Sequence, residues 1–147
     1  MGQWLVLMKA TILLSGMMLL IAQGNAESST RDAKPAGTDY EVVRTANHFS
    51  IGATGYAGTI SSTETALRRL LKTPTAAEDC RKLATTGTPA GQLYGLLGLK
   101  LLKDSAYQST AARQRSSRVE VSVTNACVIE KRPTADVARQ IDEGKIK

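Results

Sequence analysis

A row of glycines lies inside an apolar segment of the chain that has the pattern of a helix. Residues 89–102, PAGQLYGLLGLKLL, form the most apolar stretch of the chain after residue 26, and Gly91, Gly95 and Gly98 recur in it on one helix face. Glycine in a helix interior costs about 1 kcal/mol relative to alanine. The sequence therefore predicts that the backbone of a neighbouring helix approaches this face closely.

Helix-start signals flank this segment. Ser61 and Glu64 have the spacing of a capping box, in which Ser61 accepts from the N–H of Glu64 and the Glu64 carboxylate returns to the N–H of Ser61. A second helix is expected to begin at Thr73 or at Thr75, and Thr88–Pro89 begins the third. The expected helices cover residues 61–72, 73–87, 88–102, 104–113 and 133–144.

The hydrophobic period changes near residue 118. Val119, Val121 and Val123 alternate with polar residues, which indicates a half-buried strand, and residues 127–129 follow the turn residue Asn125 as its partner. The fold class expected is therefore mainly α: four to five short helices in a small bundle or helical-hairpin array, with a C-terminal β-hairpin.

Residues 1–26 have the build of a secretory signal peptide. Lys9 precedes an uncharged apolar run over 10–21, and the small residue Ala26 stands where a signal peptidase cleaves. A retained membrane anchor is the alternative. The interruption at Lys9 and the polar segment that follows Ala26 favour cleavage, which predicts a periplasmic or secreted protein with no stable membrane span after signal removal.

The rest of the chain is long enough for one domain with a modest core. Residues 27–39, ESSTRDAKPAGTD, are polar and lack apolar periodicity, so we expect them to be a disordered lead. Residues 40–147 are expected to form a single small globular domain.

Cys80 and Cys127 are the only cysteines in the chain. In an oxidising compartment an even number of cysteines usually indicates a disulfide, so we expect one bond between them that ties the second helix to the hairpin. A redox pair or a metal site is not favoured, because the chain has no C-x-x-C motif and His48 is its single histidine. We expect no cofactor.

The formal net charge of +6 is spread along the chain rather than clustered. Aromatic residues are few, so the stacking surfaces that bind single-stranded nucleic acids are not evident. We therefore expect a protein or an anionic envelope polymer as the partner, and no nucleic acid.

The loop from Gly52 to Gly58, GATGYAG, resembles the dinucleotide-binding turn of extended short-chain dehydrogenases. The context departs from that family: the helix signal at Ser61 follows the loop instead of lying within it, the Tyr-x-x-x-Lys pair is absent, and too little chain remains for the sheet. We interpret the glycines as parts of a compact turn and keep the region as a candidate binding loop. Its residues are His48, Gly52, Gly55, Tyr56, Gly58 and Glu64.

Residues 87–102, GTPAGQLYGLLGLKLL, together with the preceding glycine loop, resemble small uncharacterised bacterial exported proteins. The resemblance implies no activity. The function expected is an exported, non-enzymatic binding protein, with an inhibitor or immunity-type protein as one concrete form. The alternatives are an envelope hydrolase or transferase with a site near the loop 52–64, and a structural envelope component.

Overall fold

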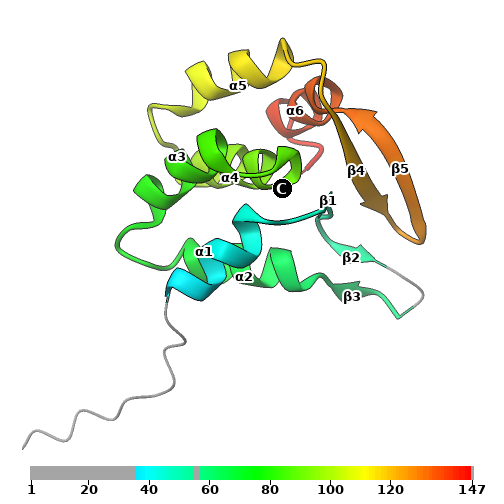
Figure 1. The fold of residues 1–147 in the computed structure, drawn as a ribbon, viewed down its shortest axis with the longest axis horizontal. Coiled ribbons are helices and arrows are strands. Elements are labelled where there is room, and N and C mark those ends of the chain that lie inside the picture. Colours follow the sequence, from blue (N-terminus) through cyan, green and yellow to red (C-terminus); the bar gives the residue numbers. More distant parts are fainter. Residues whose placement is uncertain (1–35, 55–56, 147) are drawn as a thin grey trace, which may run out of the picture. The chain divides into compact units, whose positions relative to one another are not determined.

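The computed structural model describes residues 36–54 and 57–146, and the predicted signal peptide 1–26 and residues 27–35 of the predicted lead lie outside them. Within these residues there are six helices and five strands (Figure 1). Helix α1 begins at Ala36, inside the segment for which the sequence predicted a disordered lead. In chain order the elements are α1 (Ala36–Arg44), β1 (His48–Phe49), β2 (Ala53–Thr54), β3 (Thr59–Ile60), α2 (Ser62–Leu70), α3 (Ala76–Thr86), α4 (Pro89–Leu101), α5 (Tyr107–Arg115), β4 (Glu120–Asn125), β5 (Val128–Pro133) and α6 (Thr134–Asp142).

The glycine row of α4 is a close-packing face, as the sequence predicted. A Cβ atom added at Gly95 would lie 2.6 Å from the backbone nitrogen of Ala84, and one added at Gly98 would collide with the sulfur of Cys80. Helix α3 therefore packs directly on α4 along these two glycines. Both contacts are shorter than any real Cβ tolerates, so the glycines set the distance between the two helices.

Helix α4 is the central helix of the fold. Its apolar side chains point in all directions and are almost all buried, which is the pattern of a helix covered on every side. It contacts helices α1, α3, α5 and α6 and strands β1 and β4. Thr88 caps it by accepting from the N–H of Gly91 at 3.1 Å, and Pro89 is its first residue, as predicted.

The expectation of a mainly α fold is wrong, because the fold is mixed α/β. Strands β1, β4 and β5 form a three-stranded sheet in that order, and β2 and β3 form a separate two-stranded hairpin. The predicted hairpin is present, but β1 adds to it in parallel, with Phe49 opposite Val123. This pairing joins segments far apart in the chain, so no local pattern could have revealed it. Val121 and Val123 face the core, whereas Val119 is 51% exposed.

The predicted disulfide between Cys80 and Cys127 is also wrong, and both thiols are free. Cys80 is fully buried on α3 against α4, whereas Cys127 is exposed in the turn between β4 and β5. Figure 1 shows this turn on the opposite side of the domain from α3. The two sulfurs cannot meet because one is enclosed in the core and the other lies at an exposed hairpin end.

None of the helices in the described part of the chain has the length and apolar character that a membrane span requires. The last helix follows its prediction: Val137, Ala138 and Ile141 are buried, and Gly144 ends it with a φ of 72°.

Candidate functional site

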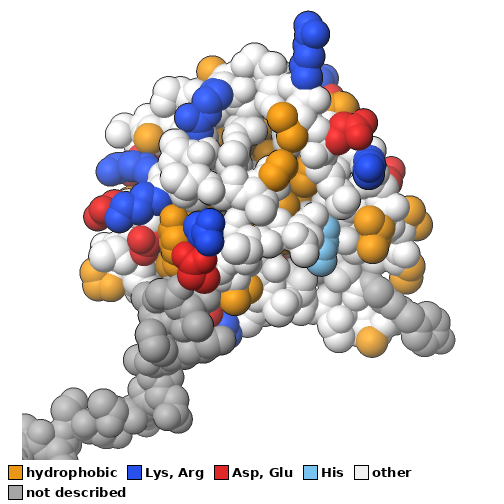
Figure 2. Space-filling view, in the orientation of Figure 1, with side chains coloured by type: hydrophobic (Ala, Val, Ile, Leu, Met, Phe, Trp, Pro, Cys, Tyr) orange, Lys and Arg blue, Asp and Glu red, His pale blue; other side chains and the backbone are white. Residues whose placement is uncertain are grey.

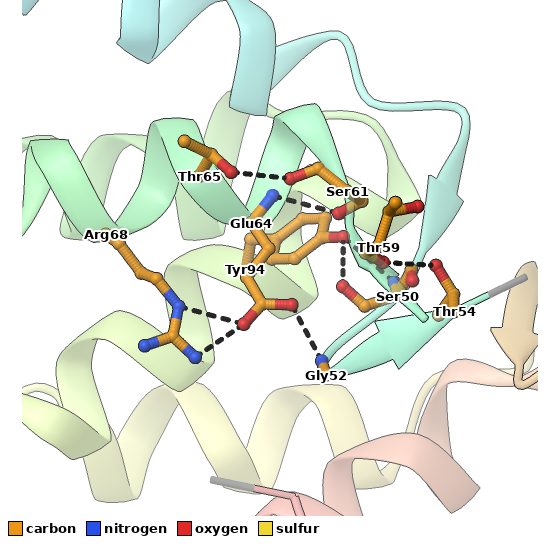
Figure 3. Close-up of polar contacts among 9 residues, drawn as sticks. All are labelled: Ser50, Gly52, Thr54, Thr59, Ser61, Glu64, Thr65, Arg68 and Tyr94. Carbon is orange, nitrogen blue, oxygen red and sulfur yellow. Dashed lines mark hydrogen bonds and ion pairs between the residues drawn. The ribbon is translucent and has the colours of Figure 1, made fainter. Parts of the chain in front are cut away.

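The connection between α1 and α2 carries the predicted binding loop, and Tyr94 anchors its first part from α4. The Tyr94 hydroxyl accepts from the N–H of Ser50 at 2.9 Å and donates to the carbonyl of Ser50 at 2.8 Å (Figure 3). The ring packs on Phe49 with centroids 4.7 Å apart. Burial raises the pKa of Tyr94, so the phenol remains a neutral donor near neutral pH.

Glu64 anchors the next residues of the connection. This side chain is only 2% exposed, and its Oε2 accepts from the N–H of Gly52 at 2.7 Å. Its Oε1 accepts from Nε and Nη2 of Arg68 at 2.9 and 2.6 Å, so the carboxylate lies between the guanidinium and the loop (Figure 3). Gly52 has a φ of 88°, a conformation that a side chain would strain.

One half of the predicted capping box is confirmed: the Ser61 hydroxyl accepts from the N–H of Glu64 at 3.1 Å. The other half is wrong, because the Glu64 carboxylate binds Gly52 and Arg68 instead of the N–H of Ser61. Burial explains why the Glu64 carboxylate binds Gly52 and Arg68 and not Ser61. A carboxylate removed from water needs a cation and several donors, and the capping box alone would supply one neutral donor.

The structure therefore brings together two of the predicted loop residues, Gly52 and Glu64. The side chain of His48 is exposed and forms no hydrogen bond or ion pair with any described residue, and the only imidazole of the chain is visible at the surface (Figure 2). Gly58 lies in the β2–β3 turn with a φ of 60°. Gly55 and Tyr56 lie outside the described residues.

A cavity of about 400 Å³ lies on one side of the connection, between the sheet and the end of α6; we call it the sheet cavity. Its polar residues come from the last part of the chain, where the sequence predicts a hairpin and a helix but no binding residue. They look like ordinary surface residues in sequence, and only the return of α6 to the sheet brings them beside Gly52. The sheet cavity is lined by Phe49, Ile51, Gly52, Val123, Thr124, Asn125, Arg132, Gln140, Lys145 and Ile146.

A second cavity of about 360 Å³ lies between α2 and α4; we call it the leucine groove. Leu67 and Leu97 form its floor and are each 2% exposed, while Leu101 at its open end is 50% exposed. Ile51 contributes to both cavities, so the connection held by Glu64 separates them. The leucine groove is lined by Ile51, Glu64, Leu67, Arg68, Leu71, Lys72, Leu97 and Leu101.

The described residues that line the sheet cavity include no carboxylate, imidazole or thiol, and the one carboxylate of the leucine groove, Glu64, is already bound by Gly52 and Arg68. In residues 36–54 and 57–146, no group of three His, Cys, Asp or Glu side chains could hold a metal ion. Comparison with protein-family models, with curated proteins and with solved structures gave no match.

Proposed function

We propose that the chain is an exported binding protein without a catalytic role, and that it binds the acidic, amphipathic helix of a partner protein in the leucine groove. The export part of the proposal rests on the signal-peptide pattern of residues 1–26. The binding part rests on one observation: a groove lined by four leucines of two neighbouring helices, buried at its floor and open at Leu101, lies beside two cations.

The leucine rows support a helical partner. Leu67 and Leu71 lie one turn apart on α2 and just beyond its end, and Leu97 and Leu101 lie one turn apart on α4. Side chains at these spacings are about 5–6 Å apart along a helix. A partner helix with apolar side chains at positions i and i+4 would place both of them between the rows, which is the helix-in-groove mode of recognition.

The charges at the edge of the leucine groove support an acidic partner. Arg68 is 59% exposed although it binds Glu64, so its guanidinium still faces solvent. Lys72 is exposed, and no carboxylate among the described residues pairs with it. Because Glu64 is buried and neutralised by Arg68, the accessible charge of the edge is positive. Glutamates that flank the apolar stripe of a partner helix would complement it.

The test uses a short, hydrocarbon-stapled helical peptide with leucines one turn apart and glutamates on the flanking positions. It is titrated into the full chain while backbone amide chemical shifts are followed. We expect saturable shifts at Leu67, Leu71 and Leu101, and weaker binding by about tenfold, equivalent to 1.4 kcal/mol, in Leu101→Asp. Lys72→Glu should weaken binding as well.

Two controls distinguish binding in the leucine groove from nonspecific hydrophobic binding elsewhere on the surface. Leu102→Asp changes an exposed leucine that does not line the leucine groove, so it should leave affinity unchanged. A peptide with lysines in place of the glutamates should bind much more weakly. Equal binding of the two peptides, or shifts confined to other surfaces, would refute the proposal.

A further inference from the structure

We infer that the sheet cavity is a binding site for a small organic anion: a carboxylate attached to an apolar body. The inference concerns a different surface from the leucine groove and does not depend on the partner proposed there. It rests on how the sheet cavity combines an oriented cation, additional donors and an apolar wall.

Arg132 supplies the main cation. Its side chain is 33% exposed, and the nearest carboxylate oxygen, on Glu130, is 3.6 Å from its Nε, beyond good hydrogen-bonding distance. With the Gln140 amide oriented so that its oxygen faces the guanidinium, that oxygen accepts from Nη1 and Nη2 of Arg132 at 3.0 and 3.2 Å. Gln140 therefore fixes the plane of the guanidinium without neutralising it.

Lys145 supplies a second cation, and the end of α6 determines its position. Gly144 takes a left-handed conformation, and the N–H of Lys145 then donates to the carbonyl of Gln140 at 3.0 Å. The ammonium pairs with Glu143 at 2.7 Å, but the two side chains are 70% and 52% exposed. Exposed ion pairs contribute little stability, so Lys145 can exchange Glu143 for a ligand carboxylate.

The apolar wall argues for an organic anion instead of an inorganic one. Phe49 and Val123 are 1% and 9% exposed, and Ile51 and Ile146 pack against the same core. A volume of about 400 Å³ falls in the range of small-molecule sites, which combine apolar walls with a few polar groups. A hydrated phosphate or sulfate would gain nothing from this wall, whereas an alkyl carboxylate would bury its chain there.

Two features near the sheet cavity could oppose anion binding, and both are compensated. The C-terminal carbonyls of α6 carry partial negative charge, but the ammonium of Lys100 donates to the carbonyls of Ile141 and Asp142. Asp136 lies on the same helix, and it is paired with Arg139. Arg132 and Lys145 remain as the cations that line the sheet cavity, and a ligand carboxylate would compete there with the exposed carboxylates of Glu130 and Glu143.

The experiment titrates hexanoate, hexanamide and inorganic phosphate into the full chain, with backbone amide shifts as the readout. We expect hexanoate to shift Val123, Thr124 and Ile146. Hexanamide, which has the same chain and no charge, should bind about tenfold more weakly or less. Arg132→Gln should weaken hexanoate binding by a similar factor, and Lys145→Gln by a smaller one. Arg139→Gln is the matched control, because it removes a cation of α6 that does not line the sheet cavity.

Every other outcome overturns the inference. Phosphate binding as tight as hexanoate would indicate a plain anion patch, and equal binding of hexanamide would indicate a plain apolar pocket. The absence of shifts with hexanoate would show that the sheet cavity does not bind this class of ligand. If Arg132→Gln does not fold, Lys145→Gln still tests whether the sheet cavity binds a carboxylate. The exposed side chain of Lys145 has no role in the core, so this variant is expected to fold.

Discussion

The carboxylate of Glu64 accepts the backbone N–H of Gly52 at 2.7 Å, and this bond fixes the boundary between the two cavities. Gly52 lines the sheet cavity and Glu64 lines the leucine groove. Ile51, the residue before Gly52, lines both cavities. A residue that looks like half of a capping box in sequence therefore acts as a clamp between helix α2 and the α1–α2 connection.

Glu64→Gln should lower the free energy of unfolding by about 1–3 kcal/mol, because a charged hydrogen-bond acceptor is lost while Arg68 and Gly52 keep their donors. Urea unfolding measures this change. Hydrogen exchange at Gly52 should also become faster. Glu41→Gln is the control, since Glu41 binds Arg44 with the same kind of contact on an exposed helix face and should change stability much less. Equal losses of stability in the two variants would show that the Glu64 carboxylate does not hold the α1–α2 connection in place.

Tyr94→Phe should also destabilise the fold by about 1–3 kcal/mol, because the N–H and the carbonyl of Ser50 both lose a buried partner. Thermal and urea unfolding report the loss. Tyr40→Phe provides the comparison, since the Tyr40 hydroxyl makes one exposed contact of 3.4 Å with Thr86. The prediction fails if Tyr94→Phe is as stable as Tyr40→Phe.

Gly98→Ala should destabilise the chain by about 1–3 kcal/mol through overpacking, despite the better helix propensity of alanine. The collision is with the sulfur of Cys80, so Cys80→Ala should relieve it in the double variant. Gly95→Ala collides with backbone atoms of Ala84 and Cys80, and the same Cys80→Ala change should not relieve it. A double-mutant cycle by urea unfolding measures both coupling energies. Similar coupling energies for the two glycines would show that the contact with the Cys80 sulfur does not cause the destabilisation by Gly98→Ala.

The two thiols should differ sharply in reactivity. Burial raises the pKa of the Cys80 thiol to about 12, so this group stays protonated and inert at neutral pH, whereas Cys127 is exposed. A thiol reagent that forms a coloured product should show one fast group in the native protein and a second only after unfolding. Cys127→Ser should abolish the fast phase. Two unreactive cysteines under non-reducing, unfolding conditions would restore the disulfide that the sequence predicted.

Several elements could be predicted from the sequence because their signals are local. Thr88–Pro89 fixes the start of α4, Ser61 fixes the start of α2, and the alternation of Val121 and Val123 indicates β4. The glycine row of α4 carried information about tertiary packing as well. A glycine that lowers helix propensity is informative when it recurs on one face.

The remaining elements depend on long-range contacts. Strand β1 has two residues and exists because Phe49 pairs beside Val123. Helix α1 mixes Gly37 with polar residues, and it is stabilised by the burial of Val43 and by the ion pair of Asp39 with Arg69 on α2. Neither contact leaves a periodic pattern in the sequence.

The candidate site could be predicted only in part for the same reason. Gly52 and Glu64 stood out as a glycine-rich loop beside an acid, and the structure joins them. Arg132 and Lys145 belong to segments that look like solvated surface, so no motif marked them. The disulfide was inferred from the number of cysteines and the expected compartment, neither of which contains information on whether the two sulfurs can meet.

Site-specific photo-crosslinking in cells that express the chain asks directly whether the leucine groove binds an acidic helix of a partner protein. A benzophenone side chain placed at Leu101 should form one discrete adduct, and its crosslinked peptide should come from an acidic amphipathic helix. The same group at Leu102 should give little of this adduct. An adduct of equal yield from both positions, or a crosslinked segment that is basic or extended, would show that the groove does not bind an acidic helix.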